Sequence, residues 1–550
     1  AGMKRTRDES ATLDALGSLV TVDLTPLTTA PERARVLKRS LALLLDAASL
    51  RAGLGTVVIE DVIGASYTFS LPNEPEGPAT PSHLIVARLH DELANLMSED
   101  LPVATVSIPR AEALAHFEAR KAEHTLELLR ACMDAHTTCH SLEIGGTTGR
   151  YLALAHGPIV ARTGCLTPKL FTLEACALTA LSCVHYRMQY AVPSTSATGE
   201  LVVAPTSEPV LLRACAERKA WSSAVGLRSV SEVGRALCES RVKPLVQISE
   251  ARHDHDIVQI AEQIAGAAKP TSERPRLVLI AGPSSSGKTT FAKRLCVALE
   301  ALGAHPAVIS VDSYYKGWPD IDARGAKHVD WEALSSLNLE QLNEHLLHLL
   351  GGEEVSVPEY DMKTSMPAPR AEWTATKLRS GGIIIMEGIH CLNPELTSKV
   401  ASKDKFRIAI SPLSSLPLDH LTPMSSTHVR MLRRMVRDYL NRGRSAVATL
   451  RQWPAVARGE RTNIYPNQNF ADVLFNSSLP YEPCVLKVHA EPLLRTITPE
   501  MAEYAEARRL LGFLQHVVSM PATLVPPQSL LREFIGGSWY YDYAGWYKTA

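Results

Sequence analysis

Short apolar runs alternate with helical or loop segments from Arg276 onward. Four of these runs are rich in β-branched residues: 277–281, 307–311, 383–386 and 406–410. Continuous apolar runs of this length are typical of strands that are buried on both faces of a sheet. A helical pattern at 290–301 follows the first run closely. The pattern therefore predicts an α/β unit in which helices flank a parallel sheet, with ligands bound at the carboxyl ends of the strands.

The chain before Arg276 mixes the periods of helices and strands. We predict helices at 32–50, 89–97 and 110–135, and strands at 56–63, 103–108 and 151–155. Turn-forming residues at 72–78 and a Ser, Thr, Ala and Pro-rich stretch at 194–207 indicate linkers. We therefore expect an α+β segment, a second α+β domain, a helical connector, the sheet-containing unit and an aromatic tail, at residues 1–81, 82–200, 201–270, 271–538 and 539–550.

The charges of the chain nearly cancel, with 57 Lys and Arg against 58 Asp and Glu and a net charge of -1. This balance creates no field that attracts polyanions, so a nucleic-acid partner is not expected, although it is left open, as is a homo-oligomer. No apolar run reaches the roughly 18 residues that a membrane span needs. The ten cysteines form no CxxC pair and the chain shows no secretory signal pattern, which favours a cytoplasmic location.

A glycine-rich loop between the first predicted strand and helix fits the phosphate-binding pattern GxxxxGK[ST]. Glycines let backbone amides surround phosphate oxygens, the helix N-terminus adds positive charge, Lys288 reaches the terminal phosphates, and the Thr289 hydroxyl can bind Mg²⁺. The alternative is an ordinary turn with a surface lysine. The predicted ATP-binding residues are Gly282, Pro283, Ser284, Ser285, Ser286, Gly287, Lys288, Thr289 and Thr290.

Two acidic residues follow predicted strands and should face this loop. Asp312 could accept a proton from a substrate hydroxyl that attacks the terminal phosphate, or it could only cap a turn. Glu387 could order Mg²⁺ through water, or it could be a solvated strand end.

Six arginines lie between residues 430 and 444 on a predicted helix and its end. Arg430, Arg433, Arg434 and Arg437 have the spacing of one helix face. They could deliver guanidinium groups to a transferring phosphate as a lid, or they could form a solvated basic face.

Several motifs together resemble the uridine kinase and phosphoribulokinase group of P-loop kinases. The motifs lie at 282–294, 311–315, 358–361, 386–390 and 434–444. Further stretches, including Asn463-Ile464-Tyr465-Pro466 and 531–538, are similar to long-form nucleoside kinase homologues. In those homologues a P-loop kinase with a parallel sheet follows a region similar to the α+β N-terminal domains of threonyl-tRNA synthetase.

The resemblance implies roles for individual positions. Asp312 matches the catalytic base, Lys288 and Thr289 match ligands of ATP and Mg²⁺, and Glu387 matches a second acid near the metal. Tyr315 and Tyr360 match aromatic residues that hold the nucleobase, and Glu332 matches an acid that binds the ribose hydroxyls. The matching lid arginines are Arg434 and Arg437, which we expect to be catalytic, and Arg442 and Arg444, which we expect to bind ATP.

The chain also departs from the patterns of these families. Short uridine kinases have an aromatic residue and a histidine where this chain has Met362 and Ser365, so the identity of the base is open. The synthetase-like helix at 38–46 lacks the usual pair of histidines, which favours a scaffold over an editing site. The cluster of Cys132, His136, Cys139 and His140 lacks the two separated pairs of a zinc site, and His253 and His255 are expected on a helix surface.

We therefore expect an ATP- and Mg²⁺-dependent kinase that phosphorylates the 5′-hydroxyl of a uridine- or cytidine-like nucleoside, or a related small alcohol. The alternative is a nucleotide-binding scaffold or RNA-associated assembly protein, motivated by the synthetase-like region and the aromatic residues at 539–547.

Overall fold

The chain forms two compact units in the computed structural model. The structure describes residues 30–72, 81–145, 149–176, 185–193, 201–203, 209–266, 274–316, 332–361, 364, 366–414 and 416–540. Unit 1 comprises 1–207, 215–235 and 414–425, and unit 2 comprises 208–214, 236–413 and 426–550. The segment 414–425 therefore belongs to unit 1 although its neighbours on both sides in sequence belong to unit 2.

A five-stranded parallel sheet forms the centre of unit 2. Its strands, in spatial order, are β11 (Pro306–Ser310), β16 (Ile383–Glu387), β10 (Leu277–Ala281), β17 (Lys405–Ser411) and β20 (Val473–Asn476). The predicted parallel sheet is confirmed, and four of its strands coincide with the β-branched runs. Strand β20 was not predicted, because its four residues lack a continuous β-branched run.

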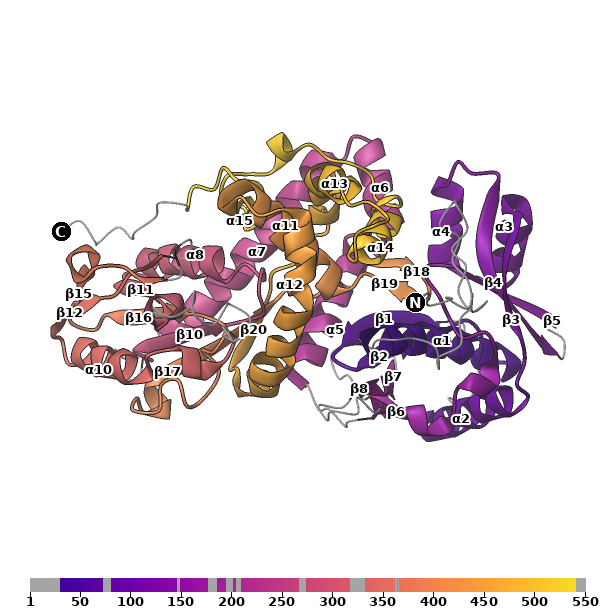
Figure 1. Ribbon diagram of the computed structural model, residues 1–550, viewed down its shortest axis with the longest axis horizontal. Coiled ribbons are helices and arrows are strands. Elements are labelled where there is room, and N and C mark those ends of the chain that lie inside the picture. Colours follow the sequence, from indigo (N-terminus) through magenta and orange to yellow (C-terminus); the bar gives the residue numbers. More distant parts are fainter. Residues whose placement is uncertain are drawn as a thin grey trace, which may run out of the picture. The chain divides into compact units, whose positions relative to one another are not determined.

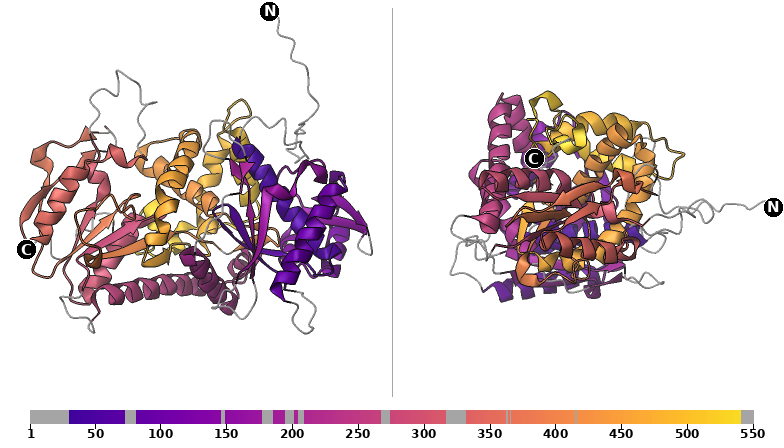
Figure 2. Two further views of the ribbon diagram at one scale, coloured as in Figure 1. Left: turned by 90° about the horizontal axis from the view of Figure 1, so that it is seen from below. Right: turned by 90° about the vertical axis from the view of Figure 1, so that its left-hand side faces the viewer.

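Helices cover both faces of this sheet (Figure 1). Helix α8 (Lys288–Ala301) contacts β10, β11 and β16. Helix α10 (Leu339–Leu350) places Leu342 and Leu346 in one buried cluster with Leu277 and Leu279 of the sheet. Helix α7 (Val242–Ala265) packs on α8 and is the long magenta helix in Figure 2. This is the layered arrangement expected of a parallel sheet that is buried on both faces.

Unit 2 contains further helices and two hairpins. The helices are α11 (Ser426–Arg442), α12 (Ala446–Gly459), α13 (Glu482–Arg495), α14 (Tyr504–Leu514) and α15 (Arg532–Ile535). The hairpins pair β12 (Glu354–Val357) with β15 (Thr374–Lys377), and β13 (Tyr360–Asp361) with β14 (Met366–Pro367). Helix α11 contacts α12, α13 and α15, so it is the helix around which this part of the unit packs.

Unit 1 contains two antiparallel sheets. The first has the order β1 (Val58–Ile63), β2 (Ser66–Ser70), β7 (His185–Tyr190) and β6 (Phe171–Cys176). The second consists of β3 (Val103–Pro109), β4 (His136–Gly145) and β5 (Gly149–Leu154). The helices and short strand pairs are α1 (Ala30–Arg51), α2 (Ser82–Ser98), α3 (Arg110–Ala119), α4 (Glu123–Ala131), β8 (Val192–Pro193) with β9 (Leu201–Val202), and β18 (Pro417–Asp419) with β19 (Thr422–Pro423).

The structure also corrects parts of the predicted organisation. The long helix expected at 110–135 is broken near Lys121, whose φ of 53° is left-handed. The boundary predicted at residue 81 does not separate two sheets. Strands β6 and β7, which follow it in the chain, lie in one sheet with β1 and β2, which precede it. His253 is not on the surface: it is buried and its Nε2 lies 3.1 Å from the Ser478 carbonyl oxygen.

Three helices lie in the described range 209–266, within the predicted connector. Its helices are α5 (Pro209–Ala224), α6 (Val230–Cys238) and α7. Each helix in the described part of the chain is too short or too polar to cross a lipid bilayer.

A fully buried carboxylate, Asp46, organises part of unit 1. Its Oδ2 accepts hydrogen bonds from Tyr151 Oη at 2.8 Å and from Arg120, and lies 3.2 Å from His420 Nε2, while Oδ1 accepts from the Val57 amide. Burial alone would raise the pKa of Asp46, but Arg120 and then His420 outweigh it and hold the pKa well below its usual range. Because His420 belongs to the segment 414–425, this cluster binds that segment into unit 1.

Replacing Asp46 by Asn should destabilise unit 1 by roughly 3–5 kcal/mol, because the buried Arg120 loses its counter-charge. The free energy of opening can be measured by native-state hydrogen exchange in peptides from β4 and β5. The stabilising effect of Asp46 should be present above about pH 4 and be lost as the pH falls further. The exposed Asp91→Asn variant is the control, and equal exchange in both variants would contradict the prediction.

Candidate active site

The glycine-rich loop lies between β10 and α8 with the backbone that a phosphate-binding loop requires. A Cβ at Gly282 would lie 2.1 Å from the Ile410 carbonyl oxygen, so only glycine fits against β17 there. Gly287 has a φ of +93° and Ser285 a φ of 60°, both in the left-handed region. The loop therefore has the tight, curled path that the motif predicts.

Two buried arginines of α11 hold the carbonyl groups of this loop. Arg433 Nη1 donates to the carbonyl oxygens of Ser285 at 3.4 Å and Ser286 at 3.3 Å, and Arg430 Nη1 donates to that of Ser284 at 3.2 Å. Each peptide plane carries its N–H opposite its C=O. Fixing three successive carbonyls toward α11 therefore favours amides that point away from it, into the space where phosphates would bind.

The same two arginines are neutralised by buried acids. Arg433 is 0% exposed and pairs with Glu482 at 2.6 Å, and Arg430 pairs with Glu460. Phe534 and Trp453 cover the guanidinium groups at 5.0 and 5.4 Å from the ring centroids. These arginines support the loop and do not belong to the solvated face that their spacing also allowed.

Lys288, Asp312 and Glu387 lie together at the carboxyl ends of β10, β11 and β16. Lys288 Nζ donates to the carbonyl oxygens of Gly282 at 3.1 Å and Pro283 at 3.4 Å, and so it lies folded over the loop. Burial, opposed by Lys288, raises the pKa of Asp312. Burial, and then the charge of Asp312, raises the pKa of Glu387 to about 7.

The remaining residues of the loop region differ in exposure. The side chain of Ser286 is buried, whereas that of Thr289 is exposed and open to a ligand.

Glu387 is fixed by Ser310, whose hydroxyl donates to its Oε1 at 3.0 Å. The Thr290 amide donates to the carboxylate of Glu533 at 3.1 Å.

The guanidinium groups of three predicted lid arginines lie close to the carboxylate of Asp438, which is 0% exposed. Arg437 lies 2.8 Å from its Oδ1, Arg434 lies 3.4 Å from its Oδ2, and Arg442 lies 3.6 Å from its Oδ1. The Arg444 amide donates to the Asp438 carbonyl oxygen at 3.0 Å. Asp438 thus gathers positive charge at one end of α11.

The lid arginines differ in what they reach. Arg434 donates to Ser284 Oγ of the loop at 2.7 Å. Arg442 and Arg437 act on Asp312 electrostatically and oppose the rise of its pKa. Burial, and then Arg437, lowers the pKa of Arg442 to about 10, so it stays charged at neutral pH.

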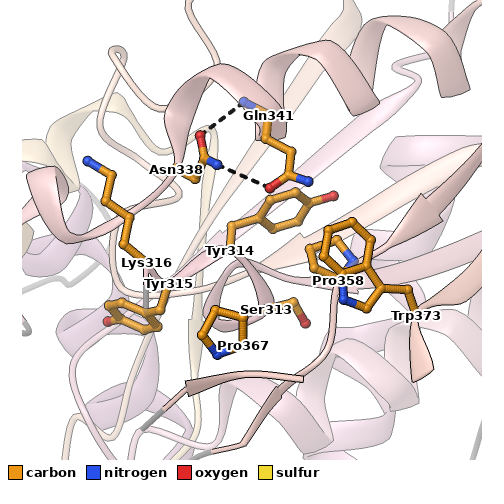
Figure 3. Close-up of a pocket in the computed structure, with 9 residues that line it drawn as sticks. All are labelled: Ser313, Tyr314, Tyr315, Lys316, Asn338, Gln341, Pro358, Pro367 and Trp373. Carbon is orange, nitrogen blue, oxygen red and sulfur yellow. Dashed lines mark hydrogen bonds between the residues drawn. The ribbon is translucent and has the colours of Figure 1, made fainter. Parts of the chain in front are cut away.

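A cavity of about 240 Å³ is lined in part by the segment that directly follows Asp312 in the chain (Figure 3). Its lining residues are Ser313, Tyr314, Tyr315, Lys316, Asn338, Gln341, Pro358, Pro367 and Trp373. The ring of Tyr315 lies 5.6 Å from that of Tyr360, so the two predicted aromatic residues are together. Burial, and then the charge of Asp312, raises the pKa of Tyr360 to about 12, which places this ring within the field of the acid.

The structure describes Glu332 but not the two positions at which this chain departs from the short uridine kinases. Glu332 lies against Gly459 of α12, and its charge acts on Arg434, so it is near the lid helix. Met362 and Ser365 lie outside the described residues.

The cysteine and histidine cluster forms no group of potential metal ligands within the described residues. Cys139 and His140 are adjacent in β4, and His140 Nε2 lies 3.1 Å from the Gly157 carbonyl oxygen. Burial lowers the pKa of His140 to about 4.

Five residues of this region were missed by the sequence analysis: Ser310, Asp438, Glu460, Glu482 and Glu533. Asp438 had a signal, because it is a lone acid within a run of six arginines and four residues from both Arg434 and Arg442. The others had none, because their partners are far away in sequence.

The family model that matches this chain is the phosphoribulokinase/uridine kinase family, over residues 277–481. Residues 277–481 form a phosphoribulokinase/uridine kinase family domain. The order of the five parallel strands and the position of the loop after β10 agree with a P-loop kinase fold. The predicted kinase family is therefore confirmed for this domain, whereas the synthetase-like character of the N-terminal region stays a prediction.

Curated relatives of this kinase-family domain are uridine kinases. That of Deinococcus deserti is 25% identical over 203 residues, which are 36% of this chain and 87% of the relative. That of Lactobacillus johnsonii is 28% identical over 204 residues, which are 37% and 87%. A solved structure, a possible uridine kinase from Bacillus stearothermophilus, aligns over 40% of this chain and 98% of its own at 19% identity with a TM-score of 0.27, so the fold assignment rests on the strand order.

The raised pKa of Glu387 predicts that this acid destabilises the ligand-free domain. Because its folded-state pKa is raised from 4.5 to about 7, the destabilisation is absent below about pH 4 and grows as the pH rises to about 7. Glu387→Gln should raise the free energy of opening by roughly 1–3 kcal/mol at pH 8 and by less at pH 5. Hydrogen exchange in peptides from β10 and β16 measures it.

The exposed Glu353→Gln variant should change neither value, because its side chain is 65% exposed beside His348. A destabilising effect of Glu387→Gln at pH 8 would contradict the electrostatic account of this acid.

Proposed function

We propose that this chain is an ATP-dependent kinase that transfers the γ-phosphoryl group to a hydroxyl of a nucleoside or a similar small alcohol. The main support is that Asp312 comes directly before the cavity-lining residues Ser313, Tyr314 and Tyr315 in the chain, and that its charge interacts with Lys288 of the loop and with Tyr360. A base with these neighbours can remove the proton of an acceptor hydroxyl that attacks the terminal phosphate of a nucleotide bound at the loop. The uridine kinases among the relatives support a nucleoside as the acceptor.

The loop residues 282–290 would bind the ATP phosphates through their amides, with Lys288 moving from its backbone contacts to the β and γ oxygens. The exposed hydroxyl of Thr289 and the carboxylate of Glu387 would supply oxygen ligands of the kind that Mg²⁺ prefers. The fit is supported by Glu387 itself, a buried acid that a nearby cation would help to ionise. Bound Mg²⁺ would supply charge neutralisation at the β and γ oxygens.

Asp312 would accept the proton of the acceptor hydroxyl. The hydroxyl oxygen would attack the γ-phosphorus as the bond from that phosphorus to the β-phosphate oxygen breaks. The raised pKa of Asp312 makes it a better proton acceptor than an exposed carboxylate. Arg437 and Arg442, whose charges reach Asp312, would stabilise the charge that spreads over the transferring group, with Arg434 and Arg444 beside them.

The acceptor would enter the cavity beside Asp312. Tyr315 and Trp373 supply aromatic surfaces for a base, and Asn338 and Gln341 supply amides for hydrogen bonds (Figure 3). Gln341 Oε1 accepts from Asn338 Nδ2 at 3.2 Å, which orients the Gln341 side chain. Glu332 stays a proposed ribose ligand on the ground of resemblance alone.

The scaffold alternative has weaker support. Within the described part of the tail, Trp539 is 72% exposed and could contact a partner, but a scaffold would not need Lys288, Asp312 and Glu387 in one recess. A cytoplasmic location stays a prediction, and oligomeric state and nucleic-acid binding stay open.

Removing the base should separate catalysis from ATP binding. Asp312→Asn should lower acceptor-dependent ADP release by a factor of roughly 10²–10⁴ while ATP still binds, because only proton transfer is lost. Lys288→Ala should lose turnover with weakened ATP binding. The assay uses Mg·ATP with a panel of nucleosides, ribulose 5-phosphate and small alcohols. ATP binding without ADP release for any acceptor would favour the scaffold.

The cavity residues should affect the acceptor and not ATP. Gln341→Ala should raise KM for the acceptor by roughly 5- to 30-fold, the effect of one hydrogen bond, and Tyr315→Leu should raise it through lost stacking. KM for ATP should stay unchanged in both variants. Phe470→Leu, at an exposed aromatic residue outside the cavity lining, is the matched control. Equal changes in both KM values would show that the cavity is not the acceptor site.

A further inference from the structure

A carboxylate from the end of the described chain is bound at the N-terminus of the phosphate-loop helix. Glu533 Oε2 accepts a hydrogen bond from the Thr290 amide at 3.1 Å. Thr290 is the third residue of α8, a helix of 14 residues, and amides in a first helical turn have no acceptor within their own helix. These amides carry partial positive charge and bind anions. The carboxylate therefore occupies one of the amides that we propose for the phosphates of ATP.

The segment that carries Glu533 is firmly packed onto the loop. A Cβ at Gly287 would lie 2.5 Å from Leu530 Cδ2, so Leu530 rests directly on the loop glycine. Phe534 is 0% exposed and packs under the guanidinium of Arg433, which itself holds the loop carbonyls. Glu533 lies between these two anchors but is only half-buried. Its side chain can therefore turn away from Thr290 while the backbone of α15 stays in place.

The charge of Glu533 opposes the binding of a phosphate group. Burial and Asp312 make the largest contributions to the raised pKa of Glu387, and Glu533 adds to them, so a third acid acts on this recess. Lys288 donates to backbone carbonyl oxygens and not to Glu533. A phosphate at the Thr290 amide would lie next to this carboxylate, and like charges at such distances repel strongly in a partly dehydrated site.

We propose that Glu533 is a built-in competitor of the nucleotide: its carboxylate caps the empty phosphate-binding loop and must be displaced when a nucleotide phosphate binds. The contact stabilises the ligand-free loop and lowers the affinity for ATP and ADP. This inference rests on the proposed binding of ATP at the loop, and it adds an autoinhibitory contact from a segment beyond residues 277–481.

The test compares nucleotide dissociation constants of the full chain and Glu533→Gln by isothermal titration calorimetry with Mg·ATP, ADP and adenosine. Glutamine keeps an oxygen that can accept from Thr290 but removes the charge. The variant should bind ATP and ADP roughly 3- to 30-fold more tightly, the range of a charge near a helix terminus. Adenosine, which has no phosphate, should bind equally well to both. Glu533→Ala should also bind ATP more tightly, and thermal unfolding confirms that each variant is folded.

Glu353→Gln removes the same charge from an exposed site and should leave the affinities unchanged. If the full chain binds ATP through Lys288, as judged by weaker binding of Lys288→Ala, and Glu533→Gln has the same affinity, the inference is overturned and the proposed function stands. Weaker ATP binding by Glu533→Gln also overturns it, since Glu533 would then be a nucleotide ligand. If neither the full chain nor Glu533→Gln binds ATP, the proposed function fails along with the inference.

Discussion

The candidate active site depends on a buried ion pair between Arg433 of α11 and Glu482 of α13. A guanidinium that is fully buried must have its donors satisfied, because an unpaired buried charge is strongly destabilising. Arg433 meets this requirement with Glu482, with the Ser477 carbonyl oxygen at 2.7 Å, and with the carbonyl oxygens of Ser285 and Ser286. The loop and the buried guanidinium of Arg433 therefore depend on each other. Arg433 fixes carbonyl groups of the loop, and those carbonyl groups help to satisfy its donors.

The two acids of the recess beside this loop, Asp312 and Glu387, are costly to ionise chiefly because they are buried. The charge of Asp312 adds to this cost at Glu387, and Lys288 and two lid arginines offset only part of it, since the pKa values of both acids remain raised. Such a site is less stable when empty than when cations are bound, which is a common cost of functional preorganisation. The same charges that destabilise the empty recess would bind a metal and accept a proton when the substrates are present.

The sequence predicted the elements whose signals are local. The β-branched runs identified four strands because residues buried on both faces must be apolar, and the loop was identified because its glycines and lysine have a fixed spacing. The break in the helix at Lys121 was missed because neither Gly nor Pro marks it. Sequence could not separate Arg430 and Arg433 from Arg434 and Arg437, since all four share one helical spacing.

What separates these arginines is the acid with which each one pairs. Glu460 and Glu482, which lie on other elements, form ion pairs with the buried Arg430 and Arg433. Asp438 lies on α11 itself and forms ion pairs with Arg434, Arg437 and Arg442. Without the buried charge of Asp438 these three guanidiniums would repel one another. Arg442 stays protonated across the neutral range even with its pKa lowered to about 10. The lid is therefore a fixed positive field, and the response of the site to pH near neutrality must come from its acids, with Glu387 titrating near pH 7.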